Sequence, residues 1–342
     1  MDKRIPVTVL TGFLGSGKTT LLQTLLKCKE GSGVAVIINE LGEVALDHLF
    51  VQKLTESAIV LKNGCICCTI REDLQTGLHE LIDGLYSKNA VPFNRIVIET
   101  TGMADPTPIA MTLDSDLMLN RQVRLANIIA TVDAIFGAEQ IDSYAENLRQ
   151  VAIADRIVLT KTDIATFKQI SLAKEKIHKV NPTAMILDAN KEKSLWHLLF
   201  DIDPFDPNTK SSEVQQWLTH LPNIKIANSK HYHKEYHNND SVETFSIQTQ
   251  EPLKWMAFAV WLSALLHRHG KNILRIKGLL NIPDALGPVV LNTVQNHIAP
   301  PMHLDKWLDD DHSSRIVFIV QGISPNMIYD SLDVFLKVLN KR

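Results

Sequence analysis

The chain has 342 residues, which is long enough for two domains or for one large domain with an appendage. With 45% hydrophobic residues, 21% charged residues and a formal net charge of −3, it carries no basic field that would mark a nucleic-acid partner. The most apolar stretch, 255–266, is shorter than the roughly 20 residues that cross a bilayer, so we expect a buried helix and no membrane partner. Met1 to Arg4 lead directly into a strand pattern, which predicts no signal peptide and a cytoplasmic location.

A phosphate-binding loop lies near the N-terminus. Residues 12–19 read Gly-Phe-Leu-Gly-Ser-Gly-Lys-Thr, between a predicted strand at 7–10 and a predicted helix at 20–26. In such a loop, backbone N–H groups surround phosphate oxygens, and the helix adds the positive end of its dipole. The motif predicts binding of a nucleoside triphosphate, with Lys18 on the β- and γ-phosphates in catalysis and the Thr19 hydroxyl on Mg²⁺. The expected nucleotide-binding residues here are Gly12, Gly15, Ser16, Gly17, Lys18, Thr19 and Thr20.

The first 200 residues alternate apolar runs with helical patterns. This alternation predicts an α/β fold of the P-loop NTPase type, with a mostly parallel sheet flanked by helices. The runs are rich in Val and Ile, which suits strands that are buried on both faces. The predicted strands are 34–39, 95–100, 125–132, 156–160 and 184–187, and the predicted helices are 71–85, 166–180 and 194–199.

Two acidic segments lie where phosphate-proximal acids are expected. The segment from Asn39 to Asp47 follows the second strand and contains Glu40, while Glu99 and Gly102 follow the third. Acids near the phosphates hold Mg²⁺ directly or through water, or orient the attacking water. We therefore expect Asp47 and Glu99 in Mg²⁺ binding and catalysis, and Gly102 as the glycine that senses the γ-phosphate. No catalytic base or arginine finger stands out, so unassisted hydrolysis should be slow.

The base-reading motif follows another predicted strand. Thr160-Lys161-Thr162-Asp163 is a T-K-x-D variant of the motif with which GTPases read guanine. The carboxylate accepts from guanine N1–H and from the exocyclic amine, whereas adenine presents an acceptor and leaves the buried charge unpaired. Thr160, Lys161 and Asp163 therefore favour GTP over ATP. The segment 187–190 lies where a final base-contacting loop is expected, but its residues are not diagnostic.

The four cysteines all lie in the first 68 residues. We expect Cys28, in the first helix, to be a small core residue. Cys65, Cys67 and Cys68 form C-x-C-C, and thiolates this close together suit Zn²⁺ or another soft or borderline metal. Three sulfurs leave one tetrahedral position for water, for a carboxylate such as Glu40, or for a ligand from a partner. A buried cysteine cluster and a redox pair are the alternatives.

The composition changes at about residue 204. We predict a P-loop domain over 1–203, a turn-rich and histidine-containing linker over 204–240, and an α+β domain over 241–342. In the last domain, the patterns predict strands at 242–249, 273–280, 289–297 and 315–320 and helices at 252–268 and 325–339.

The motifs together resemble one family. GFLGSGKTT, NELGEVALD, NGCICC, ETTGMADP and TKTD, in this order, resemble the CobW-type metal-chaperone GTPases, relatives of the GTPases that mature urease and hydrogenase. The likeness covers nearly the whole chain and includes Leu274 to Gly278 in the second half. It implies slow GTP hydrolysis, metal binding at the C-x-C-C and zinc delivery. It also implies that His231, His233 and His237 form a short metal-collecting linker, with a solvated loop as the alternative.

The sequence thus predicts a GTPase switch that couples nucleotide state to the transfer of Zn²⁺ to a client metalloprotein, with GTP and Mg²⁺ as further ligands. A zinc-buffering protein with a regulatory nucleotide site is one alternative. An assembly factor for a cobalt or iron enzyme, as in cobalamin biosynthesis or nitrile hydratase activation, is another. The client, the physiological metal and the oligomeric state, a homodimer included, stay open.

Overall fold

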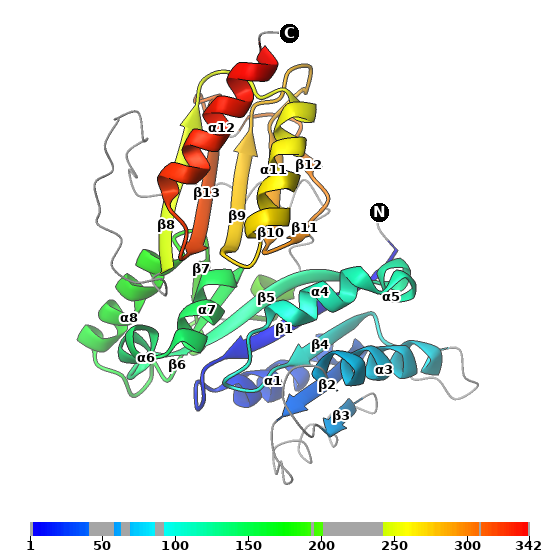
Figure 1. Ribbon diagram of the computed structural model, residues 1–342. Helices are drawn as coiled ribbons and strands as arrows, with labels where there is room; N and C mark the ends of the chain where they lie inside the picture. Colours follow the sequence, from blue (N-terminus) through cyan, green and yellow to red (C-terminus); the bar gives the residue numbers. More distant parts are fainter. Residues whose placement is uncertain are drawn as a thin grey trace. The chain divides into compact units, whose positions relative to one another are not determined.

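The computed structural model describes residues 3–40, 58–62, 69–85, 92–192, 195–200, 242–307 and 309–340. The chain divides into two compact units, which are described separately (Figure 1). The N-terminal unit comprises residues 1–177 and 184–204, and the C-terminal unit comprises residues 178–183 and 205–342. Among the predicted site residues, Asp47, Cys65, Cys67 and Cys68 lie outside the described residues, as do His231, His233 and His237.

The N-terminal unit is built on a seven-stranded sheet in the order β3-β2-β4-β1-β5-β6-β7. Each neighbouring pair of strands is parallel, and the central strands are buried on both faces, as their Val- and Ile-rich runs require. This sheet confirms the predicted P-loop type of α/β fold. The strands are β1 (Ile5–Gly12), β2 (Val34–Glu40), β3 (Ala58–Lys62), β4 (Arg95–Glu99), β5 (Val123–Asp133), β6 (Arg156–Thr160) and β7 (Met185–Asp188).

Helices connect these strands and cover the sheet. The first of them, α1, turns Leu21, Leu22, Leu25 and Leu26 toward the core, where they pack against side chains of several strands. Burying one such leucine contributes about 1.5–3 kcal/mol, so this face fixes α1 on the sheet. The connecting elements are α1 (Lys18–Leu26), η1 (Lys29–Gly33), α3 (Thr69–Gly84), α4 (Thr107–Ser115), α5 (Leu117–Gln122), α6 (Gly137–Ser143), α7 (Ala145–Ile153), α8 (Phe167–Val180) and α9 (Leu195–Phe200).

The order of the strands determines where a site can form. Parallel strands all end on the same edge of a sheet, and β1 lies between β4 and β5 in the middle of it. The loop after β1 is therefore flanked by the last residues of its neighbours. Ligands of open α/β sheets bind at this carboxyl edge. The strands end there with Glu40, Gly12, Glu99, Asp133, Thr160 and Asp188 on β2, β1, β4, β5, β6 and β7.

The C-terminal unit is a six-stranded antiparallel sheet with two helices packed on one face (Figure 1). Phe258 and Trp261 of α11 and Ile328 of α12 meet Ile276 and Phe318 of the sheet in one core. Within the described part of the chain, no helix is long and apolar enough to cross a membrane. The elements are β8 (Val242–Thr249), α11 (Trp255–His269), β9 (Ile273–Leu280), β10 (Val289–Val294), β11 (His297–Ile298), β12 (Met302–His303), β13 (Ser314–Gln321) and α12 (Pro325–Asn340).

Two sequence expectations are wrong. The strand expected over 289–297 ends at Val294, because Gln295 takes a positive φ of 48° and the chain turns back so that His297 pairs with Val294. Cys28 is not a core residue. The helix α1 ends at Leu26, and Cys28 follows it on the surface, where its thiol donates to the carbonyl of Thr24.

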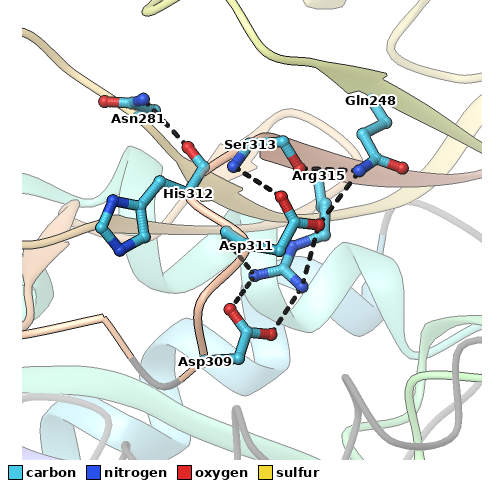
Figure 2. Close-up of polar contacts among 7 residues, drawn as sticks. All are labelled: Gln248, Asn281, Asp309, Asp311, His312, Ser313 and Arg315. Carbon is cyan, nitrogen blue, oxygen red and sulfur yellow. Dashed lines mark hydrogen bonds and ion pairs between the residues drawn. The ribbon is translucent and has the colours of Figure 1, made fainter.

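A charged cluster anchors the loop that precedes β13 (Figure 2). The Arg315 guanidinium donates to both carboxylate oxygens of Asp309, at 2.8 and 3.0 Å, and to the carbonyl of Asp311 at 3.1 Å. The Asp311 carboxylate accepts from the N–H of Ser313 at 2.9 Å and from the Gln248 amide at 3.1 Å. A forked contact of this kind fixes geometry as well as charge, so the loop is held to the start of β13.

The stabilisation that the Asp311 carboxylate gives to the folded protein depends on pH. Burial raises the pKa of Asp311, but hydrogen bonds from Ser313 and the nearby Arg315 charge outweigh burial and hold the pKa below its ordinary value of 3.8. A carboxylate with a lowered folded pKa stabilises the protein above its unfolded pKa. That stabilisation is lost as the pH falls through the folded pKa.

Substitution of Arg315 by lysine should loosen this loop. Lysine keeps the charge but cannot make the fork, and Arg315 is mostly buried, with 14% of its side chain exposed. We expect the free energy of unfolding to fall by about 1–2 kcal/mol, because hydrogen bonds to charged groups are worth about 1.5–3 kcal/mol when intact. Urea unfolding of the full chain measures this, and hydrogen exchange of residues 305–314 assigns it to the loop. The exposed Arg268, changed to lysine, is the control, and equal losses in both variants would contradict the assignment.

Candidate functional site

A cavity of about 540 Å³ opens at the carboxyl edge of the N-terminal sheet. Its walls come from the loop between β1 and α1, the first turn of α1, Ile38 near the end of β2, the end of β4 with the loop that follows, and the residue after β6. The cavity is lined by Leu14, Gly15, Gly17, Lys18, Thr19, Thr20, Ile38, Glu99, Thr100, Thr101, Gly102, Met103 and Lys161. Most of the residues predicted to contact the nucleotide are thus brought together from segments that are far apart in the sequence.

The loop between β1 and α1 packs tightly against β5 and β6. The hydroxyls of Ser16 and Thr131 are 2.6 Å apart, and the Thr160 hydroxyl donates to the carbonyl of Ser16 at 2.7 Å. A Cβ on Gly12 would lie 2.3 Å from the Thr131 hydroxyl oxygen, so only glycine fits there. Ser16 of this loop and Thr160 at the end of β6, both predicted to contact the nucleotide, are buried, and their side chains hold the loop in place.

Lys18 stands at the N-terminus of α1, where the helix dipole is positive. Its ammonium donates to the carbonyls of Gly12 at 2.9 Å and Phe13 at 3.2 Å, and so lies over the loop. The ammonium and the helix N-terminus both favour an anion at this position.

Thr19 and Glu99 form a pair beside the loop. The Thr19 hydroxyl donates to the Glu99 carboxylate at 2.6 Å, although the two residues are separated by 80 positions in the sequence. Glu99 is the last residue of β4 and is only 5% exposed. The pair presents a hydroxyl and a carboxylate oxygen to the same side of the cavity, which is a donor set that hard cations prefer.

The loop after β4 is held by α7. Gln150 of α7 is fully buried, and its side-chain amide donates to the carbonyls of Gly102 at 3.2 Å and Ala104 at 3.0 Å. On the opposite side, a Cβ on Gly102 would lie 2.7 Å from the backbone nitrogen of Leu14, so the two loops touch. Sequence reasoning missed Gln150, since it belongs to no motif and reaches the loop only through the tertiary fold.

The residues after β6 are held by charged and polar neighbours. The Lys161 ammonium donates to Asp133 at 2.6 Å, and Asp133, which ends β5, is almost completely buried. Asp163 lies on the exposed loop that follows and accepts from the Asn190 amide at 3.1 Å. Asp133 was also missed, although an acid at the end of the strand before a T-K-x-D strand is a signal that the sequence contains.

The predicted zinc ligands remain predictions. Cys65, Cys67 and Cys68 lie outside the described residues, as does Asp47, and Glu40 is described only as the last backbone position of β2. Within the described ranges, no group of three or more His, Cys, Asp or Glu side chains is arranged to hold a metal ion.

Comparison with known proteins identifies the family. Residues 6–188 match the "CobW/HypB/UreG, nucleotide-binding domain" family, and residues 242–336 match the "Cobalamin synthesis protein cobW C-terminal domain". The chain belongs to the CobW/HypB/UreG family. The expected resemblance is therefore confirmed, and the cavity lies in the part of the chain that matches the nucleotide-binding domain.

The relatives of this CobW/HypB/UreG member span most of its length. It is 32% identical over 315 residues to the zinc chaperone YjiA of Escherichia coli, covering 92% of this chain and 93% of the relative. It is 30% identical to a zinc-regulated GTPase metalloprotein activator of Schizosaccharomyces pombe, covering 82% of this chain and 73% of the relative. A crystal structure of the Zn(II)-bound YjiA GTPase from E. coli matches with a TM-score of 0.66 at 27% identity, covering 97% of this chain and 99% of that one.

Substitution of Gln150 by leucine should change how the site distinguishes nucleotides. The variant leaves two loop carbonyls without their donor, and a buried unsatisfied group costs about 1–3 kcal/mol. Because the loop carries Gly102, we expect the affinity for a non-hydrolysable GTP analogue to fall by roughly tenfold. GDP, which has no γ-phosphate, should bind nearly as before.

Competition titrations against a fluorescent GDP measure both affinities. Glu146→Gln, on the same helix, is the matched control and should bind both nucleotides like the unchanged protein. An equal loss for GTP and GDP in Gln150→Leu would contradict a role in the γ-phosphate loop.

Proposed function

We propose that this chain is a GTP-hydrolysing metallochaperone that binds Zn²⁺ at its C-x-C-C motif and transfers it to a client metalloprotein under control of the nucleotide state. One observation carries the proposal. Lys18, Thr19, Glu99, Gly102 and Lys161, from three separate segments, line the same cavity at the carboxyl edge of the sheet. The names of the relatives, zinc chaperone and GTPase metalloprotein activator, support the same function.

The triphosphate binds in the loop between β1 and α1. Lys18 leaves the carbonyls of Gly12 and Phe13 to contact the β- and γ-phosphates, and the N-terminus of α1 adds its dipole. Gly15, Gly17 and Thr20 contribute their backbone N–H groups. Phosphoryl transfer needs little beyond positioning and charge stabilisation, so these groups are the main catalytic machinery in this chain.

The donor set beside the loop fits Mg²⁺. Thr19 and Glu99 offer a hydroxyl and a carboxylate oxygen, and Mg²⁺ prefers oxygen ligands and usually retains several waters. Thr19 would hold the ion, with Glu99 and Asp47 binding it directly or through water. When bound, Mg²⁺ neutralises charge on the β- and γ-phosphates.

Guanine is the base that the site fits. The Asp163 carboxylate can only accept hydrogen bonds, so it pairs with N1–H and the amine of guanine and rejects the acceptor at N1 of adenine. The Lys161 side chain is held by Asp133 and lines the cavity, two residues before the carboxylate that would read the base.

The zinc proposal rests on the motif and on the register of two strands. Glu40, the last residue of β2, pairs with Lys62, the last residue of β3. Cys65, the first residue of the C-x-C-C motif, follows Lys62 by three positions. Cys65, Cys67 and Cys68 with Glu40 or water would complete four ligands. One weak or exchangeable ligand suits a site that must release its metal, whereas structural zinc sites are closed.

Two alternative functions are a metal-enzyme assembly factor and a zinc-buffering protein. A cobalt or iron enzyme assembly factor would use the same switch with another metal, and the zinc-named relatives favour zinc. A zinc-buffering protein with a regulatory nucleotide site would bind GTP without turnover. The intact Lys18, Thr19 and Glu99 favour hydrolysis.

The Lys18→Ala variant should lose GTP hydrolysis, because the ammonium stabilises the charge that develops on the phosphates. Lys18 lies on the surface of the loop and not in the core, so the fold should persist. Release of inorganic phosphate from GTP measures turnover, and thermal unfolding checks the fold. Undiminished turnover would show that the activity belongs to another site or to a contaminant.

The second test addresses the coupling between nucleotide and zinc. Any coupling free energy acts equally on both ligands, and a value of about 1–3 kcal/mol would change zinc affinity by roughly 5–150-fold between the GTP and GDP states. Competitive zinc titrations with a non-hydrolysable GTP analogue, with GDP and without nucleotide measure this change. We expect one zinc ion per chain, and the cysteine thiols should release protons when it binds. With Co²⁺ in place of Zn²⁺, we expect Cys–cobalt charge-transfer bands.

The chain offers matched controls for this titration. Replacing Cys65, Cys67 and Cys68 by serine should abolish the site, whereas Cys28→Ser removes an exposed thiol outside the motif and should change nothing. Identical zinc affinity in all three nucleotide states would contradict the coupling between nucleotide and zinc. The protein would then be a GTPase with an independent metal site.

A further inference from the structure

Asn190 lies in the turn after β7 and contacts the loop that carries the base-reading carboxylate. Its side-chain amide nitrogen donates to the Thr162 hydroxyl at 3.0 Å and to the Asp163 carboxylate at 3.1 Å. The two contacts use both hydrogens of the amide. Asn190 ends the segment 187–190, where the sequence predicts a final base-contacting loop but offers no diagnostic residue.

The directions of these hydrogen bonds are fixed by chemistry. The Thr162 hydroxyl donates its hydrogen to Asp188 at 2.5 Å, so it can only accept from Asn190. The Asp163 carboxylate is also an acceptor only. The amide nitrogen of Asn190 must therefore face both groups, and the opposite orientation of the amide would set oxygen against oxygen.

Asp188 provides the fixed end of this network. It ends β7, is largely buried, and also accepts from the backbone N–H of Asn190 at 3.0 Å. Burial raises the pKa of Asp188, but hydrogen bonds from Thr162 and Asn190 and the charge of Lys191 outweigh burial and hold the pKa below its ordinary value of 3.8. Asp188 is therefore ionised at neutral pH, and it orders both Thr162 and the backbone of Asn190.

We propose that Asn190 is a positioning residue for base selectivity, which orients the Asp163 carboxylate so that both of its oxygens meet the guanine edge. This inference rests on the proposed binding of GTP. Guanine presents N1–H and the exocyclic amine side by side, and a carboxylate accepts from both only when its plane is aligned with the base. A hydrogen bond from Asn190 to one oxygen restrains rotation of the carboxylate and leaves the other oxygen and a further lone pair for guanine.

The experiment compares GTP with ITP, whose base keeps N1–H but lacks the exocyclic amine. A carboxylate that rotates freely can still meet N1–H with either oxygen, but it loses the second contact. We expect Asn190→Ala to weaken GTP binding by about tenfold and ITP binding by about twofold, so that the preference for GTP over ITP narrows. Asn190→Asp, which places a carboxylate against Asp163, should weaken GTP at least as much while keeping the side-chain volume.

Affinities are measured on the full chain by competition with fluorescent GDP, and ATP is included. Glu192→Gln is the matched control, because Glu192 lies two residues after Asn190 and contacts Asp188 through its backbone N–H and not through its side chain. This control should retain the GTP-to-ITP ratio of the unchanged protein. Equal losses for GTP and ITP in the Asn190 variants, or no loss, would overturn the inference and leave Asn190 a structural residue.

The same titration separates this inference from the proposed function. If the unchanged protein binds ATP as tightly as GTP, the assignment of guanine is wrong and the inference falls with it. If the unchanged protein prefers GTP and the Asn190 variants keep the full GTP-to-ITP ratio, only the inference fails.

Discussion

Close packing between the loop after β1 and the ends of β5 and β6 is the constraint on which the rest of the N-terminal unit depends. Thr131 lies so close to Gly12 that no side chain fits at position 12. Ser16 is held between Thr131 and Thr160 by two short hydrogen bonds. A loop pinned in this way begins α1 at a fixed place. Lys18 and Thr19, the first residues of that helix, thus line the cavity on a backbone that is already in place, and only the Lys18 ammonium has to move when a nucleotide arrives.

Three parts of the expected nucleotide site are each held by a residue from a different segment. Glu99 holds Thr19, Asp133 holds Lys161, and Gln150 holds the loop of Gly102. The supporting groups are more buried than the groups they hold, so they are positioned by the core and not by the ligand. Because the supports lie on separate elements, contacts to the metal, the γ-phosphate and the base can be weakened independently of one another.

The contiguous parts of the site could be predicted from the sequence, and the supporting parts could not. A strand, a glycine-rich loop and a helix follow one another along the chain, so the motif around Lys18 fixed its own local structure. Gln150 reaches Gly102 across 48 positions, and nothing in the sequence near either residue indicates the contact. The strand β3 and the helices between 107 and 153 were missed because their apolar patterns are short. Cys28 was misplaced because α1 ends two residues before it.

The proposed coupling between nucleotide and zinc needs a physical connection between the γ-phosphate loop and the C-x-C-C segment, and α4 provides part of one. Asp105, in the loop after Gly102, accepts from the backbone N–H of Thr107 at the start of α4. At the other end, Asp116 accepts from the first turn of α5 and pairs with His79 of α3 at 2.9 Å. The helix α3 begins at Thr69, directly after Cys68. The loop of Gly102, α4 and α3 are therefore joined by a continuous series of polar contacts, which is the minimum that a coupling between Gly102 and the helix after the cysteines requires.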